Sequence, residues 1–170
     1  MTPNLSDPTD PSDVFNRSDQ SRTTVIIGVG NQLRGDDAAG IELIRLLRSK
    51  PPQDCLLIDA GSTPENYLGP VCHANPELII IVDAAEMDET PGTIRELDPG
   101  MLEWRSLHTH SSNLSLLISY LRQETTAEIS MIGIQPAQRE LGTPLSSEVK
   151  RAVDTLVLRL ADNAQLSDTL

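Results

Sequence analysis

Short runs of apolar, often β-branched residues recur along this sequence and alternate with segments that have the periodicity of helices. A strand that is buried on both faces has such a continuous apolar run, whereas a strand with one face in water alternates apolar and polar residues. We predict strands at residues 23–30, 55–61, 77–85, 92–98 and 127–136, and helices at residues 36–50, 63–71, 112–124 and 146–162. The run at residues 92–98 is the least apolar of the strands and is predicted to lie at an edge.

Strands that alternate with helices in this way predict an α/β fold. We expect a three-layer sandwich in which a mostly parallel, five-stranded sheet has helices on both faces. Residues 1–21 are rich in Ser, Thr, Asp, Asn and Pro without periodicity, so they are predicted to form a disordered N-terminal arm. Residues 22–163 are predicted to form a single α/β domain, and residues 164–170 a C-terminal tail.

Charge and hydropathy exclude two classes of partner. The formal net charge is −12, whereas binding to nucleic acid requires clustered Lys and Arg. No apolar run approaches the roughly 20 residues that are needed to span a bilayer. The N-terminus also lacks the layout of a secretory signal. We therefore expect a cytoplasmic protein that binds neither nucleic acid nor a membrane.

A glycine turn follows the first predicted strand, in the stretch VIIGVGNQLRGDDAAG. Gly28 and Gly30 lie between a strand and a helix, and Asp59 ends the second strand, where a dinucleotide-binding protein has its ribose-binding acid. The third glycine of G-x-G-x-x-G would be residue 33, which is Leu33. A dinucleotide-binding oxidoreductase is therefore an alternative that the pattern supports only in part.

Two carboxylates, Asp36 and Asp37, stand at the start of the predicted helix. A pyrophosphate needs the positive end of the helix, and like charges beside it in a partly buried crevice are costly. Capping of the helix explains one carboxylate, because a cap uses a single side chain. The other could improve the helix dipole interaction slightly, or it could bind a cation.

Polar residues gather at the carboxyl ends of the predicted strands, where α/β proteins bind their ligands. Asp37, Asp59, Asp83, His110 and Gln135 all lie at such an end or in the loop that follows it. Asp83 ends the most hydrophobic strand of the chain, and a carboxylate there is costly unless it is hydrogen-bonded, paired or bound to metal. The simpler alternative is that Asp83 caps the segment after it.

A histidine pair, His108 and His110, precedes the third helix in the stretch SLHTHSSN. One histidine in a loop is usually only a solvated side chain. Two carboxylates and an imidazole that converge at the strand ends would instead form a site with two oxygen ligands, one nitrogen ligand and open coordination positions. Such a site suits nickel, zinc or cobalt better than a closed structural zinc site.

Six segments in the same order resemble the [NiFe]-hydrogenase maturation endopeptidases: GVGNQLRGDDAAG, IDAGSTPENY, IVDAAEMDETPGTIRELDP, THSSNLSLL, IGIQP and LGTPLSSEV. The resemblance covers about residues 24–160. The segments GSTPEN, PGTIRELDP and GIQP are most similar to the branch that processes the large subunit of hydrogenases of the formate-hydrogenlyase type.

The resemblance implies an activity and a set of metal-contacting residues. Members of this family remove a short C-terminal extension from the hydrogenase large-subunit precursor once nickel has been inserted, and the cut follows a His or Arg near the last pair of nickel-binding cysteines. The family's metal-contacting residues match Asp37, Asp83 and His110. Gly28, Gly30, Asn31, Asp36, Asp59, His108 and Gln135 are secondary or structural candidates. The family commonly has glycine after the two acids, whereas this chain has Ala38.

In the picture that the resemblance implies, the precursor carries the nickel, which another divalent metal could replace in vitro. The chain shows neither a Ser-His-Asp nor a Cys-His arrangement that would supply a nucleophile. Hydrolysis then has two candidate mechanisms: the metal polarises the carbonyl or activates water, or Asp37 or Asp83 acts as general base. The family is sometimes grouped with aspartic peptidases, but their two-fold dyad fold is all-β. A non-catalytic nickel-binding assembly chaperone is the rival hypothesis.

Overall fold

The computed structural model describes residues 23–98 and 111–162. The expected N-terminal arm and C-terminal tail therefore lie outside the described residues. In chain order, the described elements are β1 (Thr24–Val29), the 3₁₀ helix η1 (Gly35–Ala38), α2 (Ala39–Leu47), β2 (Cys55–Gly61), the 3₁₀ helix η2 (Pro64–Tyr67), α3 (Leu68–His73), β3 (Leu78–Ala84), β4 (Ile94–Leu97), α5 (Ser111–Glu124), β5 (Glu128–Ile134) and α6 (Ser147–Asp162).

The five strands form one sheet in the order β2-β1-β3-β5-β4. The strands β2, β1, β3 and β5 are parallel to one another, whereas β4 pairs with β5 in the antiparallel direction. The residues of β4 are only partly buried, as expected of the least apolar run, and the strand lies at the edge of the sheet. These findings confirm the predicted α/β class and its mostly parallel, five-stranded sheet.

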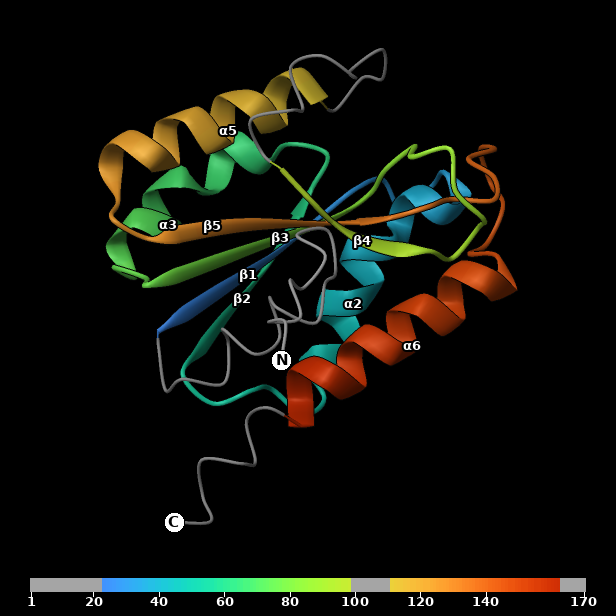
Figure 1. Cartoon of the computed structure of the whole chain (residues 1–170), viewed down its shortest axis with the longest axis horizontal. Coiled ribbons are helices and arrows are strands. Elements are labelled where there is room, and N and C mark those ends of the chain that lie inside the picture. The colour runs from blue at the N-terminus through green and yellow to red at the C-terminus, as the bar shows by residue number, and fades with distance from the viewer. Residues whose placement is uncertain (1–22, 99–110, 163–170) are drawn as a thin grey trace, which may run out of the picture.

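Helices cover both faces of the sheet and enclose two separate cores. Figure 1 shows α3 and α5 on one side of the sheet and α2 and α6 on the other. Successive residues of β3 alternate between the two cores: Ile80 packs with α2 and α6, and Ile79 packs with α5. Because β3 has a helical layer on each face, its whole length is buried, which explains its continuous apolar run.

The helix α6 buries the stripe that its periodicity predicts. Val149, Val153, Leu156 and Leu160 are all buried in the core on the α2 side of the sheet.

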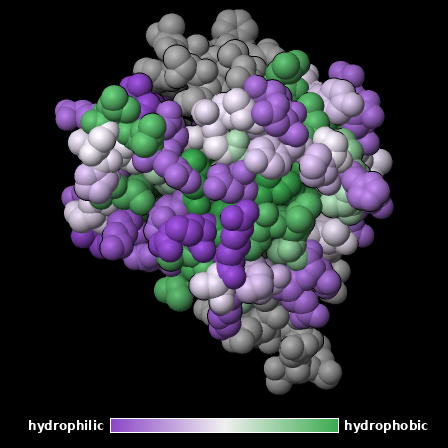
Figure 2. Space-filling model, turned by 180° about the vertical axis from the view of Figure 1, so that it is seen from behind, coloured by the Kyte–Doolittle hydropathy of each residue, from purple (hydrophilic) through white to green (hydrophobic). Residues whose placement is uncertain are grey.

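The exposed large hydrophobic side chains of the described residues are few and scattered over several elements. Figure 2 shows hydrophobic residues near the centre of the rear face, with hydrophilic side chains between and around them. Within residues 23–98 and 111–162, no helix combines the length and hydrophobicity that crossing a membrane requires.

Close packing of α2 against β1 depends on two glycines. A Cβ at Gly28 would collide with the carbonyl oxygen of Gly40, and a Cβ at Gly40 would collide with that of Val82. The helix can therefore lie against both β1 and β3 at the point where the two strands end. Such an approach requires glycine on strand and helix alike.

The helix predicted at residues 36–50 is shorter than expected and has a different first turn. The acids Asp36 and Asp37 lie in the 3₁₀ helix η1, and the α-helix begins only at Ala39. The backbone of η1 is bonded to neighbouring loops: the Asp36 N–H donates to the Gln138 carbonyl (3.1 Å). This long-range bond holds the turn, so the acids do not occupy an ordinary first turn of an α-helix.

The strand order changes direction at β1, which lies between β2 and β3. After β1 the chain adds β2 on one side, and it then returns to place β3 on the other side. In open α/β sheets, this switch point is where ligands bind, at the carboxyl ends of the two strands. The loop after β1 and the end of β3 therefore define the candidate site.

Candidate functional site

The turn after β1 depends on a backbone conformation that favours glycine. Gly30 has φ +146°, and a Cβ there would collide with the carbonyl oxygen of Asp37. The Asn31 N–H donates to that same carbonyl oxygen at 3.0 Å, and the Asn31 side-chain oxygen accepts the N–H of Leu33 at 2.9 Å. Gly30 and Asn31 thus fold the loop back on itself so that Asp37 lies beside the end of the strand.

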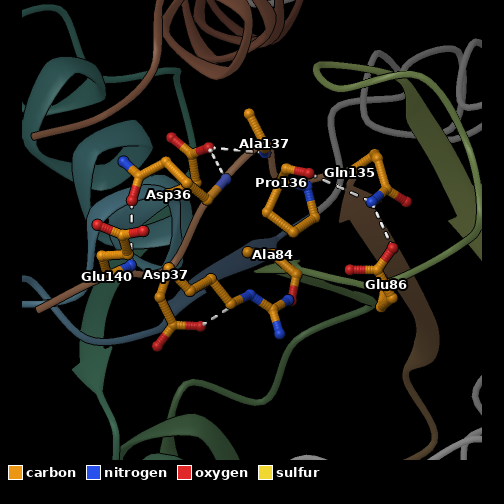
Figure 3. A network of polar contacts seen from close by, with 10 residues as sticks. Asp36, Asp37, Ala84, Glu86, Gln135, Pro136, Ala137 and Glu140 are labelled. Atoms are coloured by element: carbon orange, nitrogen blue, oxygen red, sulfur yellow. Dashed lines mark hydrogen bonds and ion pairs between the residues drawn. The ribbon is translucent and has the colours of Figure 1, made fainter. Parts of the chain in front are cut away.

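Asp36 is fully buried and does not cap its own helix. Its carboxylate accepts the N–H groups of Ala137 (2.8 Å; Figure 3) and Gln138 (3.1 Å). It also accepts the N–H (2.6 Å) and the hydroxyl (2.9 Å) of Ser146. Four donors to one carboxylate are enough to hold the buried charge. Asp36 therefore ties the turn after β1 to the loop between β5 and α6.

Asp37 is buried as well, and it faces a cation from that loop. The Arg139 Nε lies 3.7 Å from Asp37 Oδ1, which makes an ion pair but is too long for a hydrogen bond (Figure 3). Arg139 Nη2 donates to the carbonyl oxygen of Ala84 at 2.9 Å. The guanidinium thus spans the space between Asp37 and the residue that follows Asp83.

Asp83, at the carboxyl end of β3, has only 7% of its surface exposed. Its Oδ1 atom has no hydrogen-bond partner among the described residues. Burial raises the pKa of Asp83 from 3.8 to about 7, and the Asp37 charge adds to this, while Arg139 and a backbone hydrogen bond at Ala84 oppose it. A buried carboxylate with an unpartnered oxygen beside another carboxylate is suited to a cation.

His108 and His110, the imidazole members of the predicted site, lie outside the described residues. Over residues 23–98 and 111–162, no cluster of three or more His, Cys, Asp or Glu side chains could hold a metal ion. The structure brings together the two carboxylates of the predicted site, and the imidazole ligand stays a prediction.

Gln135 and Asp59, the other candidates at strand ends, are bonded to their own loops. The buried Gln135 amide accepts the N–H of Met87 (2.7 Å) and donates to the Glu86 carboxylate (2.6 Å; Figure 3). Asp59 accepts the N–H of Gly61 at 3.1 Å, two residues further along the chain. These bonds give both residues a part in shaping the loops at this edge of the sheet.

Arg139 is the site residue that the sequence did not predict. It lies three residues beyond Pro136 of the IGIQP segment, in a polar loop about 100 residues from Asp37. The one available signal was its position just past the carboxyl end of β5, the same edge that holds Asp37 and Asp83.

Neither cysteine has the properties of a nucleophile. Burial raises the pKa of the Cys55 thiol to about 11, and it also raises the pKa of the Cys72 thiol. A thiol attacks as the thiolate, which both shifts disfavour. Neither thiol is therefore a candidate nucleophile.

The family model of the hydrogenase maturation proteases matches residues 41–163 of the chain. The hydrogenase 3 maturation protease of Escherichia coli K12 is 36% identical over 139 residues, which cover 81% of this chain and 88% of the relative. A putative hydrogenase maturation protease of Methanocaldococcus jannaschii is 34% identical over 146 residues, with 81% of this chain and 86% of the relative covered.

Solved structures of such proteins have the same fold. The crystal structure of a [NiFe] hydrogenase maturation protease from Thermococcus kodakarensis KOD1 superposes with a TM-score of 0.80 at 29% identity, covering 89% of this chain and 99% of the other. The solution structure of the endopeptidase HycI from Escherichia coli gives a TM-score of 0.76 at 34% identity, with 82% and 90% covered. Sequence and fold thus agree with the resemblance of the six segments.

Proposed function

Because the chain belongs to the hydrogenase maturation protease family, we propose that it removes the C-terminal extension of a nickel-loaded [NiFe]-hydrogenase large-subunit precursor. The observation that carries this proposal is the pair of buried carboxylates at the switch point, Asp37 and Asp83, with one oxygen of Asp83 unpartnered among the described residues. Family membership leaves the oxidoreductase alternative without support.

The nickel is part of the substrate and acts as the recognition element. Asp37, Asp83 and His110 supply three ligands and leave the other coordination positions to groups of the precursor. Two oxygens and one nitrogen suit nickel, and another divalent metal can take its place in vitro. The relative in Escherichia coli is named for hydrogenase 3, and the segments GSTPEN and GIQP favour a large subunit of the formate-hydrogenlyase type as the partner.

Hydrolysis of the peptide bond follows one of two routes that make different predictions. In the first, which we favour, the nickel in the precursor polarises the carbonyl or activates water, so loss of either carboxylate weakens binding and cleavage together. In the second, Asp37 or Asp83 removes the proton from water, so the matching Asn variant still binds the nickel-loaded precursor but does not cut it.

The decisive experiment incubates the full chain with nickel-loaded and nickel-free precursor and follows loss of the tail by mass spectrometry. We expect cleavage of the loaded precursor alone, and a decrease of about 100-fold or more in Asp37→Asn and Asp83→Asn. Asp154→Asn, an equal change on the exposed face of α6, is the matched control and should cut like wild type.

Two outcomes contradict parts of the proposal. Equal cleavage by wild type and Asp37→Asn means that the site is assigned wrongly. If the wild-type chain binds the nickel-loaded precursor but does not shorten it, the chain is an assembly chaperone.

A further inference from the structure

Arg139 stands on a loop whose backbone is held on both sides of it. Asp36 accepts the N–H of Gln138, the residue just before Arg139. The Gln138 side chain in turn donates to the Pro144 carbonyl (2.8 Å) and accepts the hydroxyl of Thr143 (2.6 Å). It also accepts the N–H of Glu140, the residue just after Arg139, at 3.0 Å. The backbone on both sides of Arg139 is therefore held in place by hydrogen bonds.

The Arg139 side chain itself is held much less firmly than the backbone of its loop. Its contacts to the site are one hydrogen bond to the Ala84 carbonyl and the 3.7 Å ion pair with Asp37. Its Nε is buried and has no hydrogen-bond partner within the described ranges, and 23% of the side chain is exposed. The guanidinium can leave the carboxylates for solvent without breaking a bond of the loop backbone.

The charge of Arg139 opposes any cation that approaches the two carboxylates. A guanidinium keeps its proton at every physiological pH, so this repulsion is permanent as long as the side chain stays in place. In a partly buried site, charges a few ångströms apart interact far more strongly than they do in water. The Asp37 and Asp83 carboxylates are thus partly neutralised by the protein itself.

We propose that Arg139 is an internal counter-ion that keeps free divalent cations off the Asp37–Asp83 pair and gives way only to nickel held in the precursor. A free ion offers only its own attraction to the carboxylates. The precursor adds the contacts of a protein surface, which offset the cost of displacing the guanidinium. The role of the precursor rests on the proposed function, whereas the exclusion of free ions rests on the geometry of Arg139 alone.

The test titrates nickel chloride alone into the full-length chain by calorimetry. We expect Arg139→Gln to bind Ni²⁺ about tenfold or more tightly than wild type. Arg139→Lys keeps the charge and should stay close to wild type. The matched control is Arg45→Gln, which removes the same charge from the exposed ion pair with Glu42 on α2 and should change affinity less than about twofold.

Equal affinities in Arg139→Gln and Arg45→Gln would overturn the inference. Thermal unfolding checks that each variant is folded, and Arg139→Met, which keeps the aliphatic stem, replaces Arg139→Gln if the latter is not. Where the precursor is cut, free Ni²⁺ should inhibit Arg139→Gln at about tenfold lower concentration than wild type. If no variant cuts any precursor, the proposed function fails, while the titration still decides the role of Arg139.

Discussion

The buried Asp36 carboxylate accepts four hydrogen bonds from the protein itself, so its replacement should lower the stability of the fold. Asp36→Asn keeps the shape of the side chain but places an amide NH₂ among the N–H and O–H groups that donate to the wild-type carboxylate. We expect the free energy of unfolding to fall by about 2–4 kcal/mol, measured by urea denaturation. Asp59→Asn, whose carboxylate accepts a local bond from Gly61, should cost less than about 1 kcal/mol. Equal losses would mean that the long-range bonds of Asp36 contribute little.

The residues of the site differ in how far the sequence alone reveals them. Asp37 and Asp83 could be predicted as neighbours because Asp83 ends one apolar strand, Asp37 lies in the loop after another, and parallel strands end at the same edge. The partners of Asp36 could not be predicted, since they lie more than 100 residues away in a loop without periodicity. Arg139 escaped prediction for the same reason, because nothing local distinguishes a useful cation from a solvated one.

At the scale of elements, the approach of α2 to the sheet should tolerate no side chain at Gly40. Gly40→Ala improves helix propensity by about 1 kcal/mol but drives a Cβ into the Val82 carbonyl, so we expect a net loss of about 2 kcal/mol or more. The control is Gly69→Ala in α3, where a Cβ meets nothing within 4 Å. There the gain in propensity is opposed by the following Pro70, and the change should stay within about 1 kcal/mol by the same urea measurement.

The elements themselves were predictable where one physical effect dominates. The apolar run of β3 and the stripe of α6 follow from burial, and the structure has both. The 3₁₀ turn η1 was missed because its geometry is set by bonds to a distant loop rather than by its own residues. The direction of β4 was not predicted either, since its composition indicates an edge position but not its orientation.

At the scale of the whole molecule, β3 joins the two cores and the site. Its alternate residues belong to the cores on opposite faces of the sheet, and its C-terminal end places Asp83 at the switch point. A change in packing on either face therefore acts on the strand that positions the buried carboxylate. The same connection makes it difficult for one helical layer to unfold while the other stays folded.

This coupling predicts that the two helical layers lose their structure together. Ile79→Ala opens a cavity on the α5 side and Ile80→Ala on the α6 side, and each should lower the free energy of unfolding by about 2–5 kcal/mol. Amide hydrogen exchange, read peptide by peptide by mass spectrometry, should show α5 and α6 losing protection by similar amounts in both variants. Leu158→Ala, on the exposed face of α6, should change the free energy of unfolding by no more than about 0.5 kcal/mol and leave the protection of both helices as in wild type. Loss of protection confined to the helix nearest the cavity would show that the layers unfold separately and that β3 does not couple them.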